Sequence, residues 1–80
     1  MKIERLPNRD SVAAKPDIGA RVRQARNECG LSQTELANEL GFESPTAISL
    51  IESNSRNISA QKLYQIAHIT NLPIAFFFGV

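Results

Sequence analysis

The sequence predicts an all-α fold in which five helices pack into one compact domain. Five segments repeat apolar residues at the three- and four-residue spacing of a helix face. Most of these segments begin after serine or aspartate and end at glycine or asparagine, as helices in proteins commonly do. A chain of 80 residues with one cysteine has room for one small core and cannot form an intrachain disulfide. The core is therefore expected to come from helix packing.

Residues 1–16 are expected to form an arm or linker in front of a helical domain of residues 17–80. The segment contains Pro7 and Pro16 and few apolar residues. Residues 1–26 hold seven basic and three acidic side chains, whereas residues 27–80 hold two basic and five acidic ones. This asymmetry can place a basic arm beside phosphate groups. An ordinary solvated tail is the alternative.

The first helix is expected to start after Asp17, which is a good N-cap, and to end at Gly30. Between these residues an apolar stripe recurs at helical spacing and consists of Ile18, Val22, Ala25 and Cys29. Because Cys29 falls on this stripe, it is predicted to be a small core residue and not a reactive thiol.

The second helix is expected to start after Ser32 and to end at Gly41. Ser32 and Glu35 have the spacing of a capping box, in which each side chain accepts a hydrogen bond from the other residue's backbone. Gly41 suits the left-handed conformation that commonly ends a helix. The apolar face between these ends is expected to consist of Leu36, Ala37 and Leu40.

The third helix is expected to have Ser44 as its N-cap and Pro45 at its first helical position. Ile48 and Ile51 would form its inward face. It follows the second helix after a tight turn that contains a glycine. Two short helices joined in this way form a helix-turn-helix unit, whose second helix fits the major groove of DNA.

Two shorter signals complete the pattern towards the C-terminus. Asn54 is expected to take a left-handed conformation after the third helix, and Ser59 is expected to cap the fourth. Pro73 would open a short fifth helix. The core residues expected from these two helices are Leu63, Ile66, Ala67, Leu72, Ile74 and Phe77.

With these motifs the chain resembles the Cro-type, lambda-repressor-like (XRE) helix-turn-helix family of DNA-binding proteins. The matching residues run from Ile18 through GLSQTELANELG (30–41) and AISLIES (47–53) to NLPIAFFF (71–78). The resemblance implies a five-helix lambda-repressor-like domain. It also implies sequence-directed binding of double-stranded DNA by a transcriptional repressor or regulator, acting as a homodimer.

The resemblance places a recognition helix of about residues 45–53 in the major groove of DNA. The residues expected to contact base edges are Ser44, Pro45, Thr46, Ser49 and Leu50. Hydroxyl groups can hydrogen-bond to several bases, and a leucine can contact a thymine methyl group. Because this face has no Arg, Asn or Gln, bidentate recognition of purines is not available from it. DNA shape, water-mediated contacts or the basic arm are therefore expected to contribute to specificity.

The resemblance also suggests residues that contact DNA phosphates and a structural ion pair. The phosphate contacts are expected from Gln33, Ser53, Arg56 and Asn57. The alternative for Gln33 and Asn57 is that they are solvated polar side chains with no binding partner. Arg26 and Glu52 are expected to form an ion pair between the first and third helices, largely shielded from water. Two solvated charges are the alternative for this pair.

Three successive phenylalanines, at positions 76–78, cannot all face one small core, because neighbouring residues of a helix point about 100° apart. At least Phe76 or Phe78 should therefore be partly exposed. Both are expected at a dimer interface, since exposed aromatic residues beside apolar neighbours suggest association. The alternative is that they cover the bottom of the core.

No catalytic constellation is found, because the chain has one histidine, one cysteine and scattered carboxylates. Neither an enzyme activity nor a metal ion, cofactor or small-molecule ligand is expected. No apolar run approaches the roughly 18 residues of a membrane span, and a cytoplasmic location is expected. Two other functions stay open. The scaffold can serve as a protein-interaction module, which the near-neutral charge favours, or the chain can be a targeting domain of a longer protein.

Overall fold

The computed structural model describes residues 16–79, and every regular element in this range is a helix. The elements are α2 (Ile18–Glu28), α3 (Gln33–Leu40), α4 (Thr46–Glu52), α5 (Ala60–Thr70) and the 3-10 helix η2 (Ile74–Phe78). The all-α prediction is confirmed, with the difference that the fifth helix is a 3-10 helix. The predicted arm of residues 1–16 lies outside the described residues, except for Pro16.

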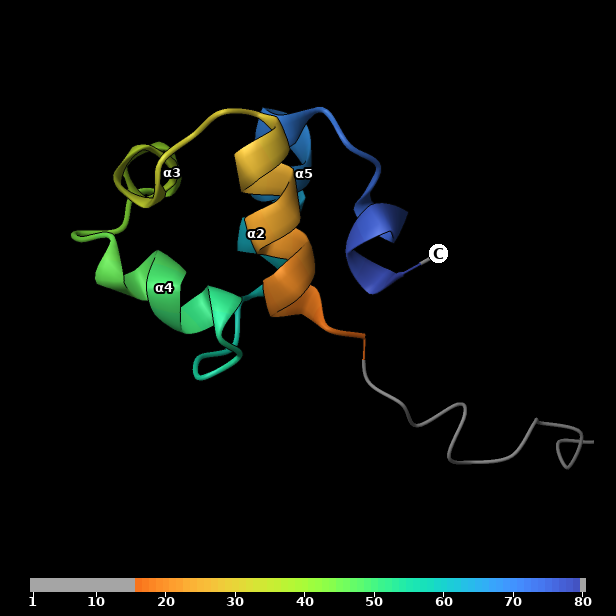
Figure 1. The fold of residues 1–80 in the computed structure, drawn as a ribbon, viewed down its shortest axis with the longest axis horizontal. Helices are drawn as coiled ribbons and strands as arrows, with labels where there is room; N and C mark the ends of the chain where they lie inside the picture. The colour runs from red at the N-terminus through yellow and green to blue at the C-terminus, as the bar shows by residue number, and fades with distance from the viewer. Residues whose placement is uncertain (1–15, 80) are drawn as a thin grey trace, which may run out of the picture.

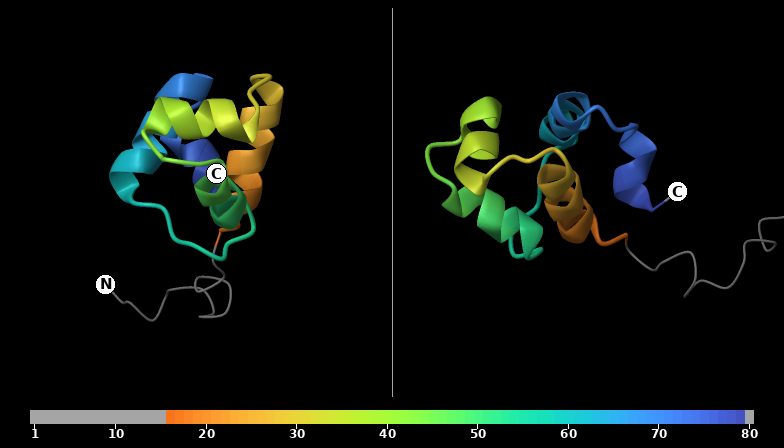
Figure 2. Two further views of the ribbon diagram at one scale, coloured as in Figure 1. Left: turned by 90° about the vertical axis from the view of Figure 1, so that its left-hand side faces the viewer. Right: turned by 45° about the horizontal axis from the view of Figure 1, so that its top comes forward.

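Helix α2 lies at the centre of the arrangement and contacts α4, α5 and η2. Figure 1 shows α3 and α4 on one side of α2 and η2 on the other. The left view of Figure 2 faces the α3 and α4 side, where these two helices lie at the edge of the domain. Helix α3 contacts both α4 and α5. The two helices of the predicted helix-turn-helix unit are thus attached to a support formed by α2 and α5.

The caps predicted for three helices are present. The Asp17 carboxylate accepts a hydrogen bond from the Ala20 N–H at 3.0 Å, and the Ser59 hydroxyl accepts one from the Lys62 N–H at 3.1 Å. In α3 the capping box is complete in both directions. These bonds satisfy backbone donors that the first turn of a helix leaves without partners.

The start of α4 differs from the prediction by one residue. The helix begins at Thr46, and Pro45, expected at the first helical position, instead precedes it without a side-chain cap. The Ser44 hydroxyl accepts a hydrogen bond from the Thr46 N–H at 3.3 Å, so it still satisfies a donor at this end. Pro45 keeps helical backbone angles, φ −67° and ψ −14°, and its carbonyl accepts the first backbone bond of the helix, from the Ser49 N–H at 3.0 Å. It therefore stands in the N-cap position, one residue before the one predicted for it.

The core contains most of the predicted apolar residues, and each of the five helices contributes at least one side chain to it. The buried apolar side chains are those of Val22, Ala25, Leu36, Ala37, Leu40, Ala47, Ile48, Ile51, Leu63, Ile66, Ala67 and Phe77. Ile18 and Leu72 are partly buried against this cluster.

Two residues predicted for the core lie at the surface. Cys29 is exposed, because α2 ends at Glu28 and the apolar stripe continues past the last helical residue. Ile74 is 40% exposed, because it lines a surface hollow together with Tyr64 and does not lie between helices. The prediction for Cys29 extended helical periodicity past the end of α2, whereas Ile74 is the first residue of η2, in which Phe77 is the buried residue.

None of the helices in residues 16–79 is long and apolar enough to span a bilayer. Within the same range no three side chains of the metal-ligating types form a group that could hold a metal ion.

Candidate nucleic-acid interface

Helix α4 has one buried side and one open side. Ala47, Ile48 and Ile51 are buried, as is Glu52 near its C-terminal end. All five residues predicted to contact base edges are exposed, namely Ser44, Pro45, Thr46, Ser49 and Leu50. The open side therefore carries three hydroxyl groups and two apolar side chains, those of Pro45 and Leu50, and none of these five side chains is charged. Such a surface can contact base edges without desolvating a charged side chain and without placing a negative charge near the phosphates.

The loop after α4 holds three of the four predicted phosphate residues at the surface. Ser53, Arg56 and Asn57 are all exposed. The Ser53 hydroxyl donates to the Leu50 carbonyl at 3.1 Å, so it is held against the end of the helix. Asn57 has no such restraint among the bonds within residues 16–79. The loop thus exposes one cation and two polar side chains directly after the open side of α4.

Phe42, in the turn between α3 and α4, has two basic side chains close to its ring. The Arg56 guanidinium lies 5.1 Å from the centre of its ring, and the Lys62 ammonium lies 5.3 Å from it. Lys62 also donates a hydrogen bond to the Leu40 carbonyl at the end of α3. Cation–π attraction therefore holds Arg56 beside the turn. Lys62 and the role of Phe42 were not predicted from the sequence, because Phe42 and the two cations come from three different segments.

Arg26 and Glu52 form an ion pair between α2 and α4. Arg26 Nε lies 2.6 Å and Nη2 lies 3.1 Å from the two oxygens of the Glu52 carboxylate. The Glu52 residue is 5% exposed, and Arg26 also donates to the Leu31 carbonyl at 2.9 Å. Gln33, the first residue of α3, donates to the same carboxylate at 3.1 Å. One buried carboxylate thus joins α2, α3 and α4.

A second connection joins the start of α2 to the end of α4. The Asn54 side chain accepts a hydrogen bond from the Gly19 N–H at 3.0 Å and donates one to the Asp17 carboxylate at 2.7 Å. Asn54 has the predicted left-handed conformation, with φ 62°. The bond from Asn54, and then the one from the Ala20 N–H, lower the pKa of Asp17. The role of Gly19 was not predicted from the sequence, although a glycine early in a helix can signal close packing.

Gly19 is needed because two backbones approach closely at this point. A Cβ atom at this position would lie 2.5 Å from the Ile51 carbonyl oxygen and 2.6 Å from that of Glu52. Any larger residue would therefore push α4 away from α2. The two connections at Glu52 and Asn54 together fix the direction of α4 relative to the rest of the domain.

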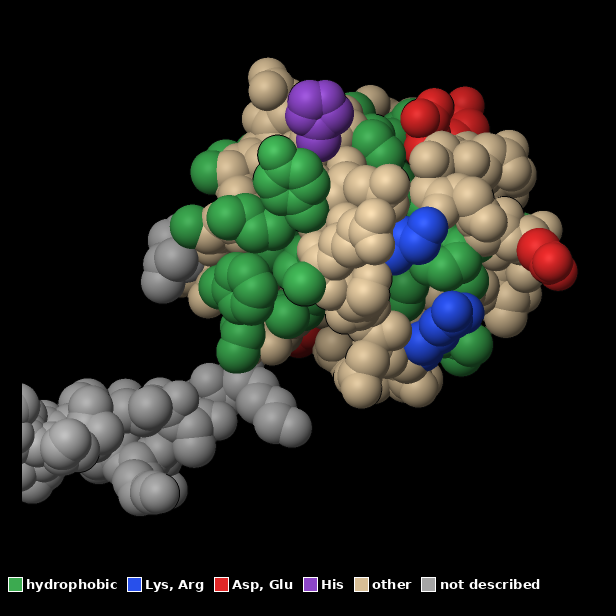
Figure 3. All heavy atoms as spheres, turned by 180° about the vertical axis from the view of Figure 1, so that it is seen from behind, with side chains coloured by type: hydrophobic (Ala, Val, Ile, Leu, Met, Phe, Trp, Pro, Cys, Tyr) green, Lys and Arg blue, Asp and Glu red, His purple; other side chains and the backbone are tan. Residues whose placement is uncertain are grey.

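The three phenylalanines of η2 have three different environments. Phe77 is fully buried, Phe76 is partly buried with Arg21 4.8 Å from its ring centre, and Phe78 is 45% exposed. Phe78 lines a hollow of about 590 Å³ with Ile74 and Tyr64. Figure 3 shows hydrophobic side chains gathered on the side of the molecule that carries η2. Of the two residues predicted for a dimer interface, Phe78 is the more accessible.

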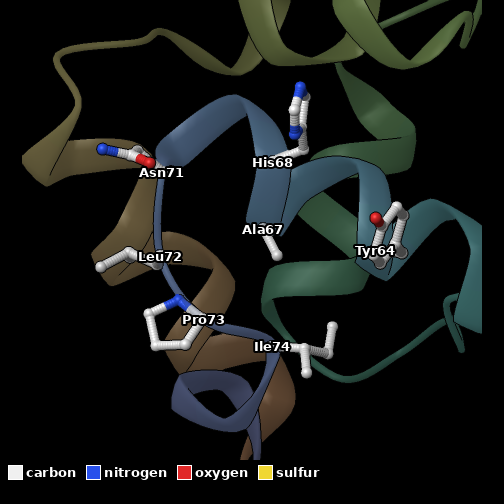
Figure 4. Close-up of a pocket in the computed structure, with 7 residues that line it drawn as sticks. All are labelled: Tyr64, Ala67, His68, Asn71, Leu72, Pro73 and Ile74. Atoms are coloured by element: carbon white, nitrogen blue, oxygen red, sulfur yellow. The ribbon is translucent and has the colours of Figure 1, made fainter.

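A neighbouring hollow between α5 and the start of η2 does not form a ligand site. It is lined by Tyr64, His68, Asn71 and Ile74, among others. Figure 4 shows the His68 ring and the Asn71 amide pointing away from Pro73 and Ile74. Because these polar groups do not converge, nothing in the hollow would fix the orientation of a small molecule.

The comparison with known protein families agrees with this geometry. The model of the helix-turn-helix family matches residues 22–77, which include α3, the turn and α4. This chain belongs to the XRE-type helix-turn-helix family.

Curated relatives carry names of regulators. An uncharacterized helix-turn-helix transcriptional regulator of Sinorhizobium medicae is 34% identical over 76% of this chain and 43% of its own length. The transcriptional regulator RamB of Mycobacterium tuberculosis is 38% identical over 80% of this chain and 13% of its own length. The chain thus spans less than half the length of either relative.

Solved structures of the same fold include regulators from several systems. The restriction-modification controller protein C.AhdI from Aeromonas hydrophila has a TM-score of 0.70 and 27% identity, covering 82% of this chain and 98% of that one. SinR, a master regulator for biofilm formation, was solved in complex with DNA; it has a TM-score of 0.66 and 33% identity, covering 75% and 95%. SinR was also solved in a complex with the SinI protein, with the same TM-score and identity.

Proposed function

We propose that this chain binds double-stranded DNA through α4 and regulates transcription as a repressor or regulator. The observation that carries the proposal is the open side of α4, which is uncharged, bears hydroxyl groups and is held rigidly from behind. The side chains of Ile48, Ile51 and Glu52 form that support. The DNA complex of SinR and the regulator names of the relatives support the same function.

In this proposal the residues on the open side of α4 contact base edges. Thr46 and Ser49 donate to or accept from the bases, and Leu50 packs against a thymine methyl group. Ser44 and Pro45 lie just before the first residue of α4 and contact the bases next to its N-terminal end. Because hydroxyl groups accept several partners, part of the specificity is expected to come from DNA shape and bridging water.

The phosphate contacts place α4 in the groove. Arg56 supplies a charge after the helix, and Asn57 supplies a neutral donor beside it. Ser53 would donate to a phosphate by turning its hydroxyl away from the Leu50 carbonyl. Gln33 offers its side-chain amide at the start of α3. One N–H of that amide is held by Glu52, so the other remains for a phosphate oxygen.

The protein is further proposed to act as a homodimer, because two recognition helices about 34 Å apart meet successive major grooves of a two-fold operator. The surface proposed for the second copy consists of Phe78 with its neighbours Ile74 and Tyr64, while Phe76 lies at its partly buried edge. Sedimentation velocity should show a dimer whose population falls when Phe78 is replaced by serine. A monomer at all concentrations would contradict the dimer.

The DNA-binding proposal is tested with duplexes selected from a random pool, where an inverted repeat is the expected result. Thr46→Asp and Ser49→Asp should then lower affinity for the selected duplex at least about 100-fold, because each places a carboxylate against acceptors of the bases and near phosphates. Gln65→Asp, which adds the same charge on an exposed part of α5, is the control. Unchanged binding by the two α4 variants would overturn the docking.

A protein-interaction module is the second candidate function. The overall charge of +1 and the uncharged open side of α4 favour it, and the SinR–SinI complex supplies a related example of a protein partner. A third is a targeting domain of a longer protein, which the short matched part of RamB favours. A linear fall of log affinity for duplex DNA with log salt concentration supports the first proposal. The absence of duplex binding at low salt supports the other two.

A further inference from the structure

Arg23 lies one helical turn before Arg26 on α2 and has a different environment. Its side chain is 62% exposed, whereas that of Arg26 is 12% exposed. Arg23 Nε lies 3.7 Å from Glu52 Oε1, the same oxygen that accepts the hydrogen bond from Gln33 Nε2. Arg23 and Gln33 therefore converge on one point, where α2, α3 and α4 meet.

The charge of Glu52 is already balanced without Arg23. Arg26 makes two hydrogen bonds to the carboxylate and a third to the Leu31 carbonyl. At 3.7 Å the Arg23 nitrogen is too far from the carboxylate oxygen for a hydrogen bond. Within residues 16–79 the Arg23 guanidinium donates no hydrogen bond. The group of Arg23, Arg26 and Glu52 consequently has one positive charge in excess, and it belongs to an exposed guanidinium.

We propose that Arg23 contacts a DNA phosphate together with Gln33, and that buried Glu52 positions both side chains for this contact. The inference rests on the DNA binding proposed above and adds an anchor on α2. A guanidinium presents planar N–H groups that match the oxygens of a phosphate, and Gln33 adds its second amide N–H beside them. Glu52 holds Gln33 by a hydrogen bond and keeps Arg23 near it by charge attraction. The anchor lies beside the C-terminal part of α4, so it would clamp α2 to the DNA backbone flanking the groove.

The experiment compares Arg23→Gln with Arg21→Gln, measuring affinity for the selected duplex between 50 and 200 mM salt. Both variants remove one charge from α2, but Arg21 lies against the ring of Phe76. The loss of one phosphate contact makes the negative slope of log affinity against log salt shallower by about 0.9. Between 50 and 200 mM salt, the fold-decrease in affinity of Arg23→Gln should therefore be smaller than that of the unaltered protein by a factor of roughly 3.5. Arg21→Gln should keep the slope. Arg23→Lys, which retains the charge, should also keep it.

The outcomes separate the two proposals. If the unaltered protein binds DNA with a salt dependence and Arg23→Gln has the same slope, the anchor is refuted and the proposed function stands. Equal slope changes in both glutamine variants would also refute it, because net charge alone would then explain them. No duplex binding by the unaltered protein at low salt overturns both proposals.

A double variant tests whether Arg23 and Gln33 share one phosphate. If they do, Arg23→Gln combined with Gln33→Ala should weaken binding by less than the product of the two separate losses. Losses that multiply would show that the two residues act independently and would overturn the shared site. Circular dichroism of each variant should show unchanged helicity, since Arg23 is mostly exposed.

Discussion

Asn54 has two structural roles, of which a glycine at the same position could fill only the first. Its backbone takes the left-handed conformation that ends α4, for which glycine is the commonest residue. Its side chain then joins Gly19 and Asp17, at the start of α2. The single residue therefore ends the proposed recognition helix and also fixes where its end lies.

Replacement of Asn54 by glycine should raise the pKa of Asp17 toward its ordinary value of 3.8. The backbone conformation is retained, but the largest cause of the lowered pKa is removed, and the Ala20 N–H bond remains. The pKa of Asp17 can be followed by NMR of its carboxyl carbon. Asn57→Gly, which removes an exposed amide from the same loop, is the control and should leave that pKa unchanged.

The sign of the pH dependence follows from the direction of this shift. Because folding lowers the pKa of Asp17, the associated stability is present above its unfolded value and is lost as the pH falls through the lower folded value. Asn54→Gly should therefore lose less stability than the unaltered protein between neutral pH and the region below 3.8. Parallel losses in the two proteins would contradict the role of Asn54.

At the scale of the helices, the buried pair of Arg26 and Glu52 ties α2 to α4. Arg26→Met leaves a buried carboxylate without its cation, and should lower the free energy of unfolding by about 3–5 kcal/mol. In the double variant Arg26→Met with Glu52→Leu the buried charge is absent, and much of this loss should be recovered. Urea denaturation measures all three proteins. A single variant as stable as the double variant would show that Glu52 is not held by charge.

The same helices explain why α4 can be short. Helices shorter than about 12 residues are marginal in water, so the seven residues of α4 depend on the packing of their buried side. Ile48 and Ile51 provide that packing, and the connections at Glu52 and Asn54 hold the C-terminal end. The open side of α4 is therefore free to vary without loss of the helix.

At the scale of the whole molecule, Phe77 joins the C-terminal segment to the rest of the domain. It is fully buried and its ring lies edge-on to that of Phe76 at 5.1 Å. Helix η2 contacts α2 and α5, so its buried phenylalanine closes the core at the end opposite α3 and α4.

Phe77→Ala should lower the free energy of unfolding by about 3–5 kcal/mol, because it leaves a cavity in a core that is otherwise filled. Leu50→Ala removes a large apolar side chain from an exposed position and should cost about 1 kcal/mol or less. Thermal and urea unfolding of both variants supply the comparison. Equal losses would show that η2 does not belong to the cooperative core.

The elements whose prediction depended on near neighbours agree with the structure. Ser32, Glu35 and Gly41 act at the ends of α3 as predicted, and the apolar faces of α3, α4 and α5 are buried. The errors arose at the ends of helices, at Cys29, which follows the last residue of α2, and at Ile74, which is the first residue of η2. The residues predicted to contact DNA lie on the surface near α4, and their contacts with DNA remain predictions.

The sequence by itself determined the all-α class, the helices, most of their caps and the family, because caps and apolar periodicity act between residues about four positions apart. The family resemblance also supplied the pair of Arg26 and Glu52. Only the tertiary structure decided the other contacts that hold α4, which are those of Asn54 with Gly19 and Asp17 and that of Gln33 with Glu52. These contacts join residues 19 to 37 positions apart. Whether such residues meet depends on the angles at which whole helices pack, and no local pattern contains that information.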